Sequence, residues 1–149
     1  MKTKIYTCLV MLLIMLGNVS IAFSQESKLA VVANDKGAPE TITEAEIIKI
    51  FKGEKQWWKD GTKIVIAFMK TSTPTGSEAS KKVLGMSGDQ LNKHWLSLVF
   101  QGKAKAPVFF NTEKELVDFV SQNKGAIGIV HKNQTGNSRT VAIDQSSIL

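Results

Sequence analysis

Three N-terminal capping boxes restrict what this chain can fold into, because each one marks the start of a helix. A capping box places a Ser or Thr three residues before a Glu or Gln, and the two side chains bind backbone N–H groups of the first turn. The pattern occurs at 43–46 (TEAE), 87–90 (SGDQ) and 112–115 (TEKE). Each box leads into apolar residues at helical spacing, and we expect the first two helices to end at Gly53 and Gly102.

Short apolar runs lie between and around these helices and have the composition of β-strands. They are found at 29–33 (LAVVA), 63–68 (KIVIAF), 108–110 (VFF) and 125–130 (GAIGIV), with one further possible strand at 140–143 (TVAI). Strands that alternate with helices predict an α/β sandwich with a mixed, largely parallel sheet.

A hydroxyl-rich segment follows the strand at 63–68 and leads into a further helix that ends at Gly85. Five of its seven residues, from Thr71 to Ser77, are Ser or Thr. A helix N-terminus has unpaired N–H groups and partial positive charge, and a glycine there lets the backbone approach an anion closely. Open α/β sheets also bind ligands beyond the carboxyl ends of their strands. The candidate ligand-binding residues are therefore Thr71, Ser72, Thr73, Thr75, Gly76 and Ser77.

The same segment has a purely structural alternative. One Ser or Thr would cap the helix, Pro74 would fix the entry of the chain, and the other hydroxyls would face water. The composition of the segment is compatible with both interpretations.

Enzymatic and metal-binding patterns are scarce in the sequence. His94 and His131 have neither a nearby Cys nor a His four residues away, so no metal site is predicted. No P-loop, dinucleotide fingerprint or G-x-S-x-G motif occurs. Two carboxylate pairs lie in first helical turns, where they complement the helix dipole: Glu44 with Glu46, and Glu113 with Glu115. We expect no catalytic residue and no cofactor.

Adjacent tryptophans at 57 and 58 could form a platform for a sugar or a peptide. Their position before Asp60-Gly61 instead favours packing of at least one ring across the turn. Trp95 has helical spacing with Leu91 and Leu98, which predicts a core position.

The first residues follow the plan of a secretory signal peptide. A basic start is followed by an apolar segment that is short for a membrane span and by the small residues Ala22 and Ser24. We expect a signal peptide at 1–24, cleavage between Ser24 and Gln25, and one periplasmic or secreted domain at 25–149. The single cysteine, Cys8, lies inside the leader, so the mature domain would depend on its core alone.

The charge of the chain excludes nucleic acid as a partner. The formal net charge is +6, and it falls to about +4 without Lys2 and Lys4. Arg139 is the only arginine, and the lysines are scattered among acids rather than clustered. A mild attraction for small anions follows.

Several separate blocks, in order, resemble the small phosphate-transporter-type periplasmic substrate-binding domains. The resemblance covers residues 28–131 and rests on Ile50-Phe51-x-Gly53, Trp58-x-Asp60-Gly61, Leu84-Gly85-Met86-Ser87, Trp95, Phe100-x-Gly102-Lys103 and Gly125-Ala126-Ile127-Gly128. It implies a single lobe of the type II periplasmic-binding-protein sandwich. The full-length relatives of this family bind phosphate between two lobes, through Ser/Thr hydroxyls and helix-start amides.

Two features of this sequence depart from the family pattern. The family has an arginine just inside the helix of the ligand loop and an aromatic residue three positions later, where this chain has Gly76 and Ala79. The loss of the arginine removes a bidentate anion clamp, which Lys81 or Lys82 could replace only in part. The predicted mature domain also has room for one lobe only, so a partner or a second copy would have to complete a closed site.

Two functions follow from these observations. The first is an exported solute-binding module of the ABC-transporter type, which binds phosphate or a related oxyanion weakly at the hydroxyl-rich helix start. The alternative is a periplasmic interaction or signalling module that reuses the fold without a small ligand and recognises an envelope protein.

Overall fold

The computed structural model describes residues 28–136 and 138–143. The predicted signal peptide and its cleavage site lie outside the described residues.

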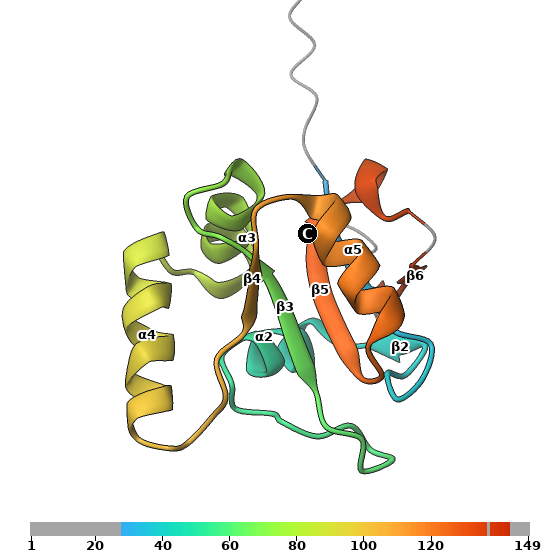
Figure 1. The fold of residues 1–149 in the computed structure, drawn as a ribbon, viewed down its shortest axis with the longest axis horizontal. Helices are drawn as coiled ribbons and strands as arrows, with labels where there is room; N and C mark the ends of the chain where they lie inside the picture. The colour runs from blue at the N-terminus through green and yellow to red at the C-terminus, as the bar shows by residue number, and fades with distance from the viewer. Residues whose placement is uncertain (1–27, 137, 144–149) are drawn as a thin grey trace, which may run out of the picture.

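A five-stranded mixed sheet forms the centre of the molecule (Figure 1). Its strands, in the order β4-β3-β5-β1-β6, are β4 (Val108–Phe110), β3 (Val65–Met69), β5 (Ala126–His131), β1 (Leu29–Ala33) and β6 (Arg139–Thr140). The strands β4, β3 and β5 are parallel, whereas β1 runs antiparallel to both β5 and β6. The predicted α/β fold with a mixed sheet and a parallel core is confirmed.

The predicted strand at 140–143 is wrong as a single element. The chain leaves the main sheet after β6, and Val141 donates its backbone N–H to the carbonyl of Val31. Residues Ala142–Ile143 then form β7, which pairs in parallel with β2 (Thr41–Ile42) in a separate small sheet. The two-residue strands on either side of Val141 therefore belong to two different sheets.

All three capping boxes form as the sequence predicts. They start α2 (Glu44–Phe51), α4 (Gly88–Phe100) and α5 (Glu113–Gln122), and in each case both capping hydrogen bonds are present. The other α-helix of the described residues is α3 (Pro74–Leu84), and a short 3₁₀ helix, η1 (Lys132–Gln134), follows β5.

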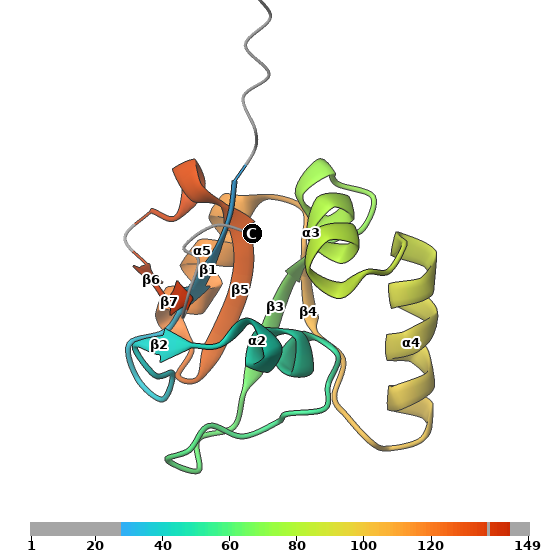
Figure 2. The same cartoon turned by 180° about the vertical axis from the view of Figure 1, so that it is seen from behind.

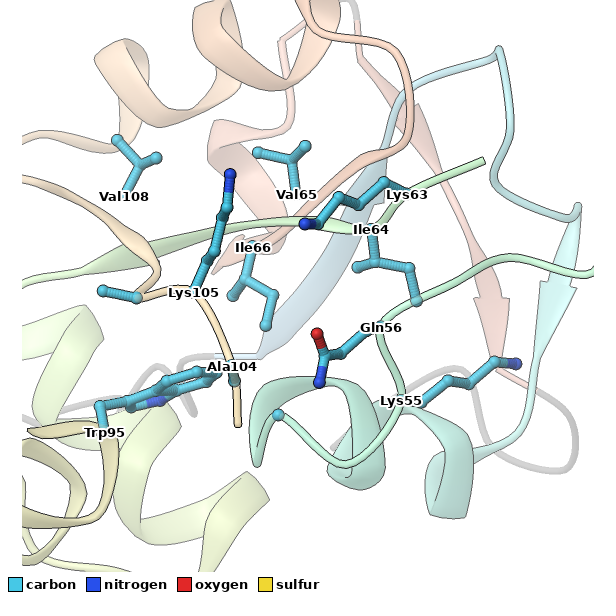
Figure 3. A pocket seen from close by; sticks show the side chains of 12 residues that line it. Lys55, Gln56, Lys63, Ile64, Val65, Ile66, Trp95, Ala104, Lys105 and Val108 are labelled. Carbon is cyan, nitrogen blue, oxygen red and sulfur yellow. The ribbon is translucent and has the colours of Figure 1, made fainter. Parts of the chain in front are cut away.

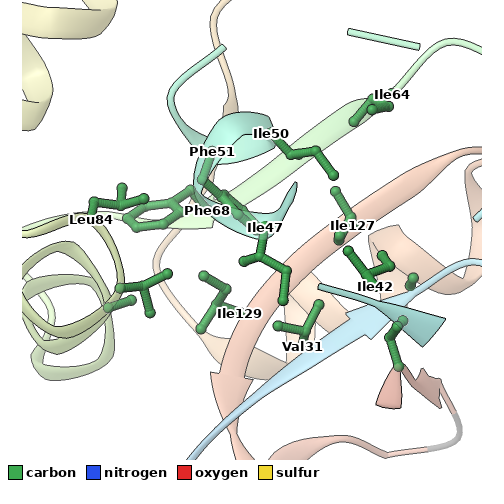
Figure 4. Packing of buried hydrophobic residues seen from close by; sticks show 14 of the residues in the cluster. Val31, Ile42, Ile47, Ile50, Phe51, Ile64, Phe68, Leu84, Ile127 and Ile129 are labelled. Atoms are coloured by element: carbon green, nitrogen blue, oxygen red, sulfur yellow. The ribbon is translucent and has the colours of Figure 1, made fainter. Parts of the chain in front are cut away.

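The helices cover the two faces of the sheet unequally. Helix α5 lies over β5 and β3 on one face (Figure 1), whereas α2 and α3 pack on the other, with α4 beside α3 (Figure 2). The larger core lies on the α2 side, where the rings of Phe51 and Phe68 are 5.7 Å apart (Figure 4). Among the described residues, no helix combines the length and apolarity needed to cross a bilayer.

The tryptophans occupy the positions that the sequence predicts. Trp58 is buried and donates its indole N–H to the carbonyl of Gly125, just before β5, at 3.0 Å. Trp95 is a core residue, as its spacing indicates. Trp57, in contrast, is 56% exposed.

Candidate functional site

The parallel strands β3, β4 and β5 end at one edge of the sheet, which we call the carboxyl edge. The chain continues there into α3 after β3, into α5 after β4, and into η1 after β5. The first turns of two helices and the end of a central strand therefore meet at this edge. This topology brings together four side chains that are far apart in sequence: Thr75, Glu78, Glu113 and His131.

His131 is held between the two carboxylates. Its Nδ1 lies 2.7 Å from Oε1 of Glu113, and its Nε2 lies 3.1 Å from Oε2 of Glu78. Glu78 also pairs with Lys82 at 2.8 Å, one helical turn further along α3. The imidazole thereby connects the end of β5 to both α3 and α5.

Glu113 binds three groups at the carboxyl edge. Its Oε2 accepts a hydrogen bond from the backbone N–H of His131 at 3.1 Å. Its Oε1 receives the hydroxyl of buried Thr75 in a short hydrogen bond and also faces the His131 ring. Complementing the dipole of α5, the role that the sequence predicts, does not account for these contacts.

The protonation of His131 reflects its two acidic neighbours. Burial acts to lower the pKa of His131, but the hydrogen bonds with Glu78 and Glu113 outweigh it, so its pKa is raised above the usual 6.5. Protonated imidazole donates from both ring nitrogens, which matches a carboxylate on each side. The geometry thus favours a charged His131 between two carboxylates.

The candidate ligand residues at the start of α3 are largely used by the protein itself. Thr73 is the N-cap, since its Oγ1 accepts from the N–H of Gly76 at 3.1 Å and donates to the carbonyl of Lys70 at 2.7 Å. Thr71 accepts a hydrogen bond from the side chain of Asn92 at 3.2 Å. The prediction that one hydroxyl residue caps this helix, with Pro74 at its first position, is confirmed.

Ser72 and Ser77 are the remaining hydroxyls of the segment. Ser72 is exposed, Ser77 is half-buried, and neither side chain forms a hydrogen bond with another described residue. The backbone N–H of Ser77 is bound within the helix to the carbonyl of Thr73 at 2.9 Å. Their role in ligand binding stays a prediction.

Gly76 allows the start of α3 to pack closely against the backbone at the end of β3. A Cβ at this position would lie 2.1 Å from the carbonyl oxygen of Lys70 and 2.6 Å from that of Met69. The first turn of α3 is therefore pressed against the end of β3, and only glycine fits between them.

The sequence did not single out Glu78, Glu113 and His131 as one cluster. The three residues lie on separate elements, and no local spacing relates them. A usable signal was the position of His131 at the end of a strand parallel to β3, because this predicts that it lies beside the start of α3. Within residues 28–136 and 138–143, no group of three acidic, His or Cys side chains is arranged to hold a metal ion.

No family model matches the chain, and no curated protein matches it in sequence. Solved structures are similar in fold. An ABC-type phosphate transport receptor from Vibrio cholerae superposes with a TM-score of 0.63 at 17% identity, over 80% of this chain and 47% of the receptor.

Two further structures give similar values. PstS from Borrelia burgdorferi has a TM-score of 0.62 at 15% identity, over 80% of this chain and 48% of its own. A phosphate ABC transporter substrate-binding protein from Clostridium perfringens, solved with bound phosphate, has a TM-score of 0.60 at 15% identity, over 79% of this chain and 45% of its own. This chain therefore spans about half the length of the structures it matches.

The fold is that of one lobe of a type II periplasmic binding protein, with a five-stranded mixed sheet and a parallel core. Two of the structures with this fold, from Vibrio cholerae and Clostridium perfringens, are described as components of phosphate transport. The predicted resemblance is thus confirmed at the level of fold.

Proposed function

We propose that this protein is an exported, non-enzymatic module that reuses one lobe of the phosphate-binding fold to recognise another protein of the cell envelope. One observation carries the proposal: the carboxylate of Glu113 occupies the carboxyl edge, where it binds the Thr75 hydroxyl and the His131 backbone N–H. These are the kinds of donor that an oxyanion would need. An internal carboxylate already satisfies them.

Electrostatics supports the same conclusion. An incoming phosphate would compete with Glu113 for its donors and would also face Glu78, which lies on the other side of His131. The two carboxylates already pair with the imidazole of His131. The family that this sequence resembles has an arginine at the position of Gly76, so this chain lacks that bidentate anion clamp. Phosphate should therefore bind weakly or not at all.

The second candidate function is weak binding of phosphate or a related oxyanion as a solute-binding component of a transporter. It is favoured by the hydroxyls of Ser72 and Ser77 at the start of α3 and by the phosphate bound to the Clostridium protein of the same fold. A periplasmic or secreted location, which the leader-like sequence predicts, suits both candidates.

Isothermal titration of residues 25–149 with phosphate and with sulfate, at low salt, separates the two candidates. We expect no saturable heat with millimolar phosphate. Saturable heat that disappears in the Ser72→Ala, Ser77→Ala variant, which keeps the Thr73 cap, would overturn the proposal and establish an oxyanion site.

Removal of the Glu113 carboxylate tests directly whether this group prevents phosphate from binding. In Glu113→Ala, the donors of Thr75 and His131 become available, so we expect millimolar phosphate to bind to this variant. Asp118→Ala is the matched control, because it removes a carboxylate from an exposed position of the same helix without touching His131 or the capping box. Equal heats in both variants would show that Glu113 does not block the site.

A further inference from the structure

An unassigned cavity lies at the opposite end of β3 from the carboxyl edge. It has a volume of about 250 Å³ and lies between the start of β3, helix α4 and the chain that joins α4 to β4 (Figure 3). Apolar side chains form most of its wall, among them Ile64, Ile66, Trp95, Ala104 and Val108. We call it the amino-edge cavity.

The charged groups at the amino-edge cavity are all basic. Lys55, Lys63 and Lys105 line it, and none of the lining residues is acidic. Lys55 is paired with Glu46 at 2.6 Å, whereas Lys63 and Lys105 form no ion pair with any described residue. Figure 3 shows these two lysines on two sides of the cavity, with their ammonium groups turned toward the space between them.

Exposed apolar side chains continue outward from the cavity. Val108 lies in its wall and is 40% exposed, and Trp57 is in contact with the rim, since the ammonium group of Lys63 lies 5.5 Å from its ring centroid. Gln56 joins this segment to the chain after α4 by donating to the carbonyl of Lys103 at 2.6 Å. Single exposed apolar residues are common on proteins, but a group of them beside a cavity indicates an interaction site.

The exposed apolar rim of the cavity, more than its volume, favours a protein over a small molecule as the ligand. Pockets that enclose small ligands have volumes of about 300–1,000 Å³. The amino-edge cavity is smaller and is bordered by exposed Trp57 and Val108, which a small ligand would leave uncovered. One or two anchoring side chains of a protein partner fit these dimensions better.

We propose that the amino-edge cavity binds an acidic segment of a partner protein. An apolar side chain of the partner fills the space between Ile66, Trp95 and Ala104, and its flanking carboxylates pair with Lys63 and Lys105. The inference rests on the proposed function, because it names the partner class of the interaction module. A lipid surface suits the site less well, since a flat bilayer does not reach into a recessed wall.

The test uses a fluorescein-labelled hexapeptide with a central Phe-Leu pair between two pairs of glutamates. Its fluorescence anisotropy is titrated with residues 25–149 at low ionic strength, where charge complementarity acts most strongly. We expect saturable binding, a loss of about tenfold in affinity for the Lys63→Glu, Lys105→Glu variant, and a similar loss for Ala104→Phe, which fills the cavity.

Matched controls keep the test specific. The Lys81→Glu, Lys132→Glu variant makes the same change of net charge on α3 and after β5, and it should bind like the wild type. A peptide with lysines in place of the glutamates should not bind. Equal loss in both double variants, or no anisotropy change up to millimolar protein, would overturn the inference.

A last arm separates the inference from its alternatives. The protein is also co-sedimented with vesicles of phosphatidylglycerol and phosphatidylcholine. If it binds the vesicles, loses this binding in Lys63→Glu, Lys105→Glu, and does not bind the peptide, the surface is assigned to anionic membranes instead. The phosphate titration stands apart from both results. Saturable phosphate binding would contradict the proposed function. The inference about the amino-edge cavity is contradicted only by the peptide results.

Discussion

At the scale of single residues, Gly76 gives a sharp test of how the start of α3 is built. Replacing glycine by alanine inside a helix normally stabilises it by about 1 kcal/mol. At this position the added methyl group would collide with the carbonyls of Met69 and Lys70, so we expect the substitution to destabilise the protein instead. We expect Gly76→Ala to lower the free energy of unfolding by about 1–3 kcal/mol, measured by urea denaturation.

The neighbouring position provides the control for Gly76. Ser77→Ala lies in the same turn and adds no atoms, so it should change the stability by less than about 0.5 kcal/mol. A Gly76→Ala variant as stable as the wild type would mean that the backbone contact with Lys70 is looser than the structure indicates.

His131 should make the stability depend on pH. Its pKa is raised in the folded protein because, although burial opposes this, Glu78 and Glu113 favour the charged form. A raised pKa stabilises the fold fully below the unfolded value of about 6.5, and this contribution is lost as the pH rises through the folded pKa.

The His131→Gln variant isolates this contribution. At pH 6 we expect it to be less stable than the wild type by about 1.5–3 kcal/mol, because hydrogen bonds to charged partners are removed. Thermal unfolding of both proteins between pH 6 and pH 9 should show the difference shrinking as the pH rises. A constant difference across this range would mean that His131 is already neutral at pH 6.

Among the helices, α5 has its C-terminal end capped by a side chain that is distant in the sequence. Asn34 follows β1, is buried, and donates its amide to the carbonyls of Val120 and Ser121, both at 2.9 Å. Its Oδ1 accepts from the N–H of Lys36 at 2.9 Å. One side chain therefore satisfies carbonyls that the end of a helix leaves unpaired.

Asn34→Asp should be strongly destabilising. The change replaces a donor by a charged oxygen that faces two carbonyl oxygens, and we expect a loss of about 3 kcal/mol or more in the free energy of unfolding. Asn133→Asp, the same chemical change on exposed η1, should alter the stability by less than about 0.5 kcal/mol. Urea denaturation of both variants gives the comparison, and similar midpoints would contradict the proposed role of Asn34.

The elements also show what the sequence could predict. Capping boxes are local, so the starts of α2, α4 and α5 were predicted from four residues each. The partners of Asn34 lie 86 and 87 residues away, and Glu113 is 18 residues from His131, so no local pattern contains these contacts. The division of 140–143 between two sheets likewise depends on β2, which lies about a hundred positions earlier.

At the scale of the whole molecule, the two ends of the parallel strands have opposite character. The carboxyl edge is polar, and its donors are bound by Glu113 and Glu78. The amino edge is apolar and basic, and Lys63 and Lys105 have no acidic partner among the described residues. The two edges thus differ in whether the protein's own side chains already satisfy their polar groups.

If the exposed apolar residues are kept for recognition, they should contribute little to folding. Phe100 on α4 is 83% exposed, whereas Trp95, on the same helix, is 4% exposed and packs in the core. We expect Phe100→Ser to change the free energy of unfolding by less than about 0.5 kcal/mol, and Trp95→Ala to lower it by about 3–5 kcal/mol. Urea denaturation followed by circular dichroism measures both. A large loss in Phe100→Ser would mean that this side chain packs against the protein itself and that its exposure in the structure is wrong.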